Sequence, residues 1–246
     1  MTTSNKEIFN QNDELLQKHL NLKGMRPKTQ AAYLRGVRHL GKYFDHDVTD
    51  LSASQLVDYF DTLLKARSWS TVKHHVYGLK FYYQHVLDKP WAHIDLVQPP
   101  TQKRLPDIVS VEEVAMLFNA THILSYKVFF FTLYSLGLRL GEGLALTVAD
   151  VDGPGRRVHV RNAKGNKDRF VPLPEITLHV LRRFWARHRH PTLLFPNRKR
   201  GLAGCHAEKT PLDRGGVQQA LRAVCESCGV KKRLPLIHCA IVMPRI

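Results

Sequence analysis

The sequence contains no apolar run long enough to span a membrane, and it opens with the polar residues Met1 to Lys6. A membrane helix needs about 20 consecutive apolar residues, and a secretory signal needs an apolar segment of its own. Cysteine is scarce as well: the chain has four, all in its last fifth. This distribution does not resemble a secreted disulfide framework. We therefore expect a protein of the reducing bacterial-type cytoplasm, with no membrane partner.

Acidic residues are few compared with basic ones. Asp and Glu number 21 against 37 Lys and Arg, so the formal net charge is +16. A surplus this large, spread over both halves, indicates a polyanionic partner, and nucleic acid is the commonest one. A surface of acidic lipid is the rival, but the sequence offers neither a strongly amphipathic terminal helix nor a lipidation motif. We therefore expect a nucleic-acid-binding protein.

The first hundred residues are predicted to form four or five short helices. Apolar residues recur at helical spacing within residues 15–20, 33–44, 56–64 and 72–86. Ser52 and Gln55 form a capping box ahead of the third of these segments. Short helices joined by short links make a compact bundle. Consecutive prolines then stop helix formation, which predicts an extended linker over residues 97–105.

A second unit is predicted after the linker, where the apolar period changes from helical to alternating. Ser110 and Glu113 form another capping box, and an apolar helix is expected around residues 128–134. Alternation then predicts a β-hairpin around the turn Lys164–Asn166. The expected strands cover residues 157–161 and 168–173, and two further helices are expected at 176–187 and 217–228.

Two motifs in this second unit carry the chemistry. Ser135 to Glu142 has the sequence Ser-Leu-Gly-Leu-Arg-Leu-Gly-Glu, and the hairpin contains Lys-Gly-Asn-Lys-Asp-Arg from Lys164 to Arg169. Singly, each is ordinary, because an arginine near a helix start is usually solvated and Gly-Asn suits any hairpin tip. Combined with the bundle, the linker, the Thr29–Tyr33 stretch and Leu-Leu-Phe-Pro at 193–196, they are specific. The chain resembles the tyrosine recombinases, also called the phage integrase family, over about residues 10–233.

The resemblance implies a mainly α fold with a small β-hairpin or sheet. It implies a helical SAM-like core-binding domain and an incomplete α+β tyrosine-recombinase catalytic domain. We expect the core-binding domain over residues 1–96, the linker over 97–105, the partial catalytic domain over 106–233 and an out-of-frame tail over 234–246.

The family cuts one DNA strand with a tyrosine, forming a 3′-phosphotyrosine without metal, cofactor or external energy. The resemblance therefore implies a site that surrounds a phosphate with positive donors. Arg139 corresponds to the first arginine, whose planar fork holds two non-bridging oxygens. Lys164 corresponds to the hairpin lysine that protonates the departing 5′ oxygen. Glu142 matches an acidic position that orients the arginine.

Double-stranded DNA is the implied partner, gripped by both domains with other recombinase protomers beside it, during integration of a mobile element on the bacterial nucleoid. Most contacts of this kind go to the DNA backbone and fix position without reading sequence. Basic residues in these places are as often plain surface charges. The expected contacts are Lys28, Thr29, Arg35, Arg38, Lys73, His74, Lys80, Lys167 and Arg169.

The pattern breaks near the end of the sequence. The family continues with a His-x-Leu-Arg-His box and then the tyrosine nucleophile, but here His238 is followed by Ile241 where the arginine should stand. The last tyrosine of the sequence is Tyr134, in the wrong place for the role. Two functions therefore compete, an active recombinase and a catalytically inactive DNA-binding remnant, and a usable tyrosine would discriminate between them.

The genetic code suggests a frameshift upstream of Leu236. In the shifted frame, each codon consists of the last base of one original codon and the first two bases of the next. The junction of the His238 and Cys239 codons must then encode Leu, and the junction of the Met243 and Pro244 codons must encode Ala. The other junctions from Leu236 onward permit His-Pro-Leu-Arg-His-Ser-Tyr-Ala-Thr-His, which is the missing box. We therefore expect the tail to be out of frame.

The cysteines and histidines raise a minor alternative, a zinc-stabilised DNA-binding protein. Cys205-His206, Cys225-x-x-Cys228 and His238-Cys239 are all possible ligands, since thiolate and imidazole suit zinc. Cys228 continues a helical stripe with Val217, Leu221 and Val224, however, so a core position explains it more simply. We expect no bound metal.

Overall fold

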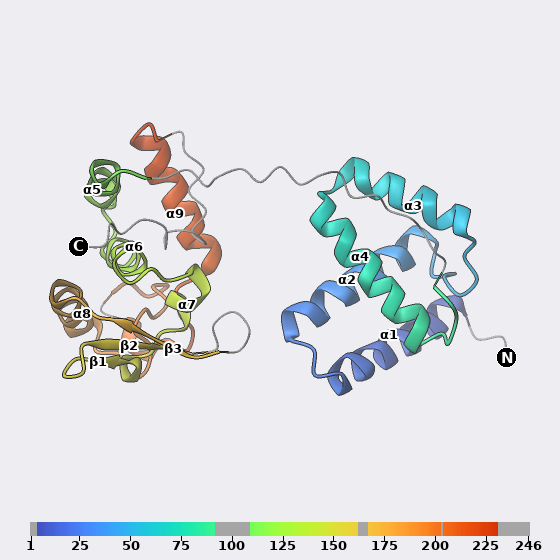
Figure 1. Ribbon diagram of the computed structural model, residues 1–246, viewed down its shortest axis with the longest axis horizontal. Coiled ribbons are helices and arrows are strands. Elements are labelled where there is room, and N and C mark those ends of the chain that lie inside the picture. The colour runs from blue at the N-terminus through green and yellow to red at the C-terminus, as the bar shows by residue number, and fades with distance from the viewer. Residues whose placement is uncertain (1–3, 92–108, 162–166, 203, 231–246) are drawn as a thin grey trace. The chain divides into compact units, whose positions relative to one another are not determined.

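The computed structural model describes residues 4–91, 109–161, 167–202 and 204–230. The chain divides into two compact units, residues 1–103 and 104–246 (Figure 1). The predicted linker at 97–105 and the predicted tail at 234–246 lie outside the described residues. Within the described ranges, no helix combines the length and the apolar character needed to cross a bilayer.

The first unit is a bundle of helices, as the apolar periodicity predicted. Pro27 occupies the first position of the second helix, where its missing N–H leaves no hydrogen bond unmade. The predicted capping box of the third helix is confirmed, because the Ser52 Oγ accepts from the Gln55 N–H at 3.2 Å and the Gln55 Oε1 accepts from the Ser52 N–H at 2.8 Å. The helices in the described part of this unit are α1 (Asn5–Leu22), α2 (Pro27–Tyr43), α3 (Ala53–Ala66) and α4 (Trp69–His85).

Two glycines allow α2 and α4 to pack closely. A Cβ on Gly36 would lie 3.1 Å from the Cα of His75, and one on Gly78 would lie 3.0 Å from the Cα of Tyr33. Any larger residue at either position would force the helices apart. The seven residues of this unit that we expected to contact DNA all belong to α2 and α4, so this crossing fixes their spacing.

The second unit combines helices with a small antiparallel sheet in the order β1–β2–β3. In β2, the buried residues Val158 and Val160 alternate with Arg157, which is exposed, and His159, which is half-buried, as the period of two in a strand requires. In the core, Phe129 and Phe195 meet edge to face with ring centroids 5.0 Å apart. The elements are α5 (Val111–Ala120), α6 (Leu124–Leu136), α7 (Leu140–Ala145), η1 (Val148–Asp150), β1 (Val151–Asp152), β2 (Arg157–Val160), β3 (Arg169–Pro172), α8 (Glu175–His188), η2 (Cys205–Ala207) and α9 (Arg214–Ser227).

The mainly helical fold with a small sheet is confirmed, and so is the predicted pairing of β2 with β3, in which His159 lies opposite Phe170. The predicted turn at 164–166 lies outside the described residues. The helix α9 begins before the predicted residue 217, because the Asp213 side chain caps it by accepting from the Gly216 N–H at 2.6 Å. The strand β1 was not predicted, since two residues are too few to show alternation.

Candidate functional site

The direction of Arg139 is set by the residues just before it. At the end of α6, Gly137 adopts a left-handed conformation with φ of 59°, which glycine takes without steric cost. The Leu138 N–H then donates to the Leu133 carbonyl at 3.0 Å, and the Leu138 side chain is fully buried. This is the helix ending in which an apolar residue after the glycine anchors the chain. Arg139 follows at once as the N-cap of α7.

Glu142, in the first turn of α7, is the buried centre of an ionic cluster. Its Oε2 accepts from the Arg139 N–H, and its Oε1 accepts from the Arg139 Nη1, both at 2.9 Å. A carboxylate in the first turn also interacts favourably with the helix dipole. The Glu142 side chain is only 8% exposed, whereas that of Arg139 is 46% exposed. The arginine is therefore held by a buried carboxylate while nearly half of its side chain stays exposed.

Arg169, which we expected among the DNA contacts, is the second partner of this carboxylate. Its Nη1 donates to Glu142 Oε1 at 2.9 Å and its Nη2 donates to Oε2 at 2.8 Å. Such two-pronged pairing fits the planar geometries of guanidinium and carboxylate. The hydrogen bonds from Arg169, helped by those from Arg139, lower the pKa of Glu142 to about 2 although burial opposes ionisation. The carboxylate is therefore charged at neutral pH.

A second ion pair holds the other side of the hairpin, directly after β2. Asp150 is buried and accepts from the Arg161 Nε at 2.6 Å and from the Thr147 Oγ1 at 2.6 Å. Burial opposes ionisation of Asp150, but the hydrogen bonds from Thr147 and Arg161 outweigh it and lower its pKa. We did not single out these residues from the sequence. The Thr147-x-x-Asp150 spacing of a capping box was the available signal.

Of the two hairpin lysines, Lys164 and Lys167, the structure describes Lys167. Lys164 lies outside the described residues, in the connection between β2 and β3. Lys167 is exposed, two residues before Arg169. Beside them, His159 Nε2 lies 3.0 Å from a carboxylate oxygen of Asp168, so the strands on both sides of the undescribed tip are held by polar contacts.

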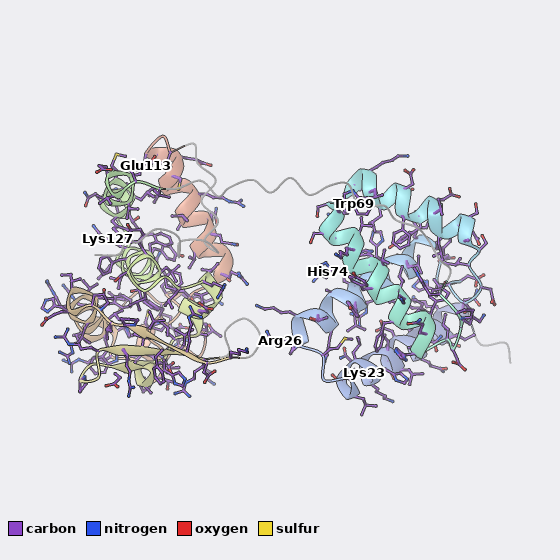
Figure 2. All side chains as sticks on the ribbon, in the orientation of Figure 1. Lys23, Arg26, Trp69, His74, Glu113 and Lys127 are labelled. Atoms are coloured by element: carbon purple, nitrogen blue, oxygen red, sulfur yellow. The ribbon has the colours of Figure 1, made fainter. Side chains whose placement is uncertain are left out.

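The expected DNA contacts of the first unit lie on two adjacent helices, α2 and α4. All are exposed except Thr29, which is half-buried. Figure 2 shows His74 projecting from α4. Three of them already have partners: Arg38 donates from Nε and Nη2 to Asp13, His74 Nδ1 lies 2.6 Å from the Ser70 carbonyl oxygen, and the Lys73 ammonium lies 5.8 Å from the centre of the Tyr77 ring. The expected residues here are Lys28, Thr29, Arg35 and Arg38 on α2, and Lys73, His74 and Lys80 on α4.

The proposed zinc ligands are not gathered in the described part of the chain, which contains no cluster of three or more His, Cys, Asp or Glu suited to a metal ion. Cys205 is buried, and its Sγ donates to the carbonyls of Asn197 and Gly201. On α9, Cys225 is the buried cysteine, and Cys228 is half-buried at the helix end. His238 and Cys239 lie outside the described residues.

Two sequence families match the chain, one for each unit. The N-terminal SAM-like domain of phage integrases matches residues 14–93, and the phage integrase family matches residues 107–237. The second match covers more than half of the chain and ends next to His238, where the sequence departs from the family's box.

Curated relatives and solved structures agree with these matches. A tyrosine recombinase XerD of Oceanobacillus iheyensis is 26% identical over 229 residues, covering 86% of this chain and 75% of the relative. An integrase/recombinase of Escherichia coli is 32% identical over 168 residues, covering 66% of this chain but only 49% of the relative. A structure of a lambda integrase tetramer bound to a Holliday junction has the same fold, with a TM-score of 0.68, 12% identity and coverage of 94% of this chain and 70% of that one.

Proposed function

The chain belongs to the phage integrase family, and from this premise we propose that it binds duplex DNA as part of a site-specific recombinase that integrates a mobile element. The observation that carries the proposal is the arrangement of Arg139. A buried carboxylate holds its Nη1, the Arg139 side chain is still 46% exposed, and β3 of the hairpin starts at the same cluster. A phosphate that gains charge in a transition state needs donors fixed in this way.

In this proposal Arg139 binds two non-bridging oxygens of the scissile phosphate. Nη1 is occupied by Glu142, so Nε and Nη2 are the nitrogens that face the phosphate. Lys164 donates a proton to the departing 5′ oxygen, because an alkoxide is a poor leaving group without one. Both residues stabilise charge and neither is a nucleophile.

The first unit supplies most of the binding. We assign the core-binding domain to residues 1–96 and the catalytic domain to residues 106–233, joined by 97–105. The basic residues of α2 and α4 contact the DNA backbone, and this electrostatic term makes affinity fall steeply with salt. The lambda integrase of the compared structure is a tetramer on a Holliday junction, which supports assembly of this chain with other protomers on DNA in the cytoplasm, at the nucleoid.

A second candidate function is DNA binding without cleavage. It is favoured by the sequence after His238, where Ile241 stands in the place of the family's second arginine. Tyr134 is half-buried in α6, with its ring 6.0 Å from that of Phe118. A phenol that attacks phosphorus must be aimed in line with the leaving oxygen.

Covalent trapping separates the two candidates. The chain is incubated with a nicked duplex carrying a candidate end sequence from the DNA that flanks its gene, beside a version with the reading frame restored past Lys232. We expect both to bind and only the restored version to form an adduct on a denaturing gel. An adduct with the unrestored chain, abolished by Arg139→Ala, would identify an unrecognised nucleophile and refute the non-cleaving function. Absence of salt-sensitive binding by either version would refute both candidates.

A further inference from the structure

The cluster around Glu142 has an arginine that the mechanism above does not use. Arg169 lies at the start of β3 and directs both terminal nitrogens of its guanidinium to the two carboxylate oxygens. Together with the N–H and Nη1 of Arg139, this gives each oxygen of Glu142 two donors. A carboxylate with its acceptor positions filled in this way has little capacity to accept further donors.

The charges in the cluster do not cancel. Two guanidiniums face one carboxylate, which leaves a net charge of about +1 on the side where Arg139 is exposed. If Arg169 turned to a DNA phosphate instead, it would leave a carboxylate that is 8% exposed with Arg139 as its remaining arginine. Removing one partner from a buried ion pair is costly, because the other charge stays buried. Arg139 would then be drawn wholly onto Glu142 and away from the phosphate.

We propose that Arg169 is a positioning residue that holds Glu142, so that Glu142 takes only one edge of Arg139 and leaves the other edge for phosphate. It also ties the hairpin to the N-terminus of α7, because its hydrogen bonds with Glu142 join two segments that are 27 residues apart in sequence. Arg169 therefore acts through Arg139 and makes no DNA contact of its own. The proposal rests on the proposed function, since it assumes that Arg139 binds a phosphate.

The low pKa of Glu142 agrees with this arrangement, because its largest cause is the pair of hydrogen bonds from Arg169. The same bonds raise the pKa of Arg169. Arg157 provides a matched control on the neighbouring strand. Its Nε donates to Asp152 at 2.9 Å, an arginine–carboxylate pair of the same sheet that does not include Glu142.

The first test is a double-mutant cycle on DNA affinity, with the full chain and a random-sequence duplex long enough for both units. We expect Arg139→Ala to weaken binding several-fold and to reduce the salt dependence by about one phosphate contact. Arg169→Gln should weaken binding by a similar factor in the native background and have no effect when Arg139 is already alanine. Arg169→Lys keeps the charge but loses the planar fork, so its loss of affinity in the native background should be smaller than that of Arg169→Gln. Equal losses of affinity on Arg169→Gln in both backgrounds would overturn the proposal, and so would no loss in either background when Arg139→Ala itself weakens binding.

A second arm needs no DNA and shows which assumption has failed. The Nε–H resonance of Arg139 is followed by NMR in the free protein. Arg169→Gln should shift it and slow its exchange with solvent, because Glu142 then engages more of the guanidinium. Arg157→Gln should leave it unchanged. If this arm behaves as expected while Arg139→Ala does not alter DNA binding, the positioning role stands and the proposed function fails. If the Arg139 resonance is indifferent to Arg169→Gln, the positioning role is wrong even where Arg139 does bind DNA.

Discussion

Replacing Glu142 by glutamine should destabilise the second unit in a pH-dependent manner. The ordinary pKa of 4.5 is lowered to about 2 in the folded protein. Each pKa unit corresponds to about 1.4 kcal/mol, so the charged carboxylate contributes about 3 kcal/mol of stability at pH 7. Because the folded pKa lies below the unfolded one, this contribution is complete above about pH 5 and is lost as the pH falls toward 2. Near pH 3 about half should remain.

The assay is urea unfolding followed by fluorescence of Trp185, the tryptophan of α8, after Trp69 and Trp91 of the first unit are changed to phenylalanine. Glu142→Gln in this background should lose about 3 kcal/mol at pH 7 and roughly 1.5 kcal/mol at pH 3. The control is Glu175→Gln, whose side chain is 83% exposed beside Arg156 and should cost less than about 1 kcal/mol at either pH. A Glu142→Gln penalty that stays constant between pH 7 and pH 3, or one no larger than the control, would refute the reasoning.

Four further predictions follow from single features of the molecule. Phe129→Ala should cost about 3–5 kcal/mol in thermal or urea unfolding, because the ring is fully buried against Phe195, whereas Phe170→Ala, at 58% exposure, should cost about 1 kcal/mol or less. Ser52→Ala should remove about 1 kcal/mol from the first unit by breaking the α3 capping box, and retention of full stability would show that Gln55 suffices alone. Lys73→Gln should lower the slope of log affinity against log salt for duplex DNA by about 0.9, while Lys65→Gln on α3, paired with Asp61, should leave it unchanged. Translation of the coding DNA in the alternative frame past Lys232 should yield His-x-Leu-Arg-His and then a tyrosine, and an immediate stop codon there would contradict the frameshift.

The sequence predicted the fold where local patterns carry the information. Capping boxes at Ser52 and Ser110 place helix starts because the reciprocal hydrogen bonds join residues three apart. Alternation placed β2 and β3 because side chains on a strand have a period of two. Gly137, two residues before Arg139, could be predicted to end a helix, because glycine adopts the left-handed conformation of a helix C-terminus without steric cost.

The composition and the motifs also sufficed to identify the family and to nominate Arg139 and Glu142 as a pair, since side chains three positions apart are neighbours at a helix start. The excess of basic residues predicted a polyanionic partner without any structure. None of these steps requires knowledge of which residues distant in sequence lie together.

The carboxylate partner of Arg169 was decided by tertiary structure alone. From the sequence it was one more basic residue in a hairpin, and we expected it to contact DNA. The register of β3 against β2 and the packing of α7 bring it onto a carboxylate 27 residues away. The same is true of the pair formed by Asp150, at the end of η1, and Arg161, directly after β2, which lie 11 residues apart. A buried charge needs an opposite charge beside it, and long-range packing determines which charged side chain lies close enough. Local sequence patterns contain no information on that packing.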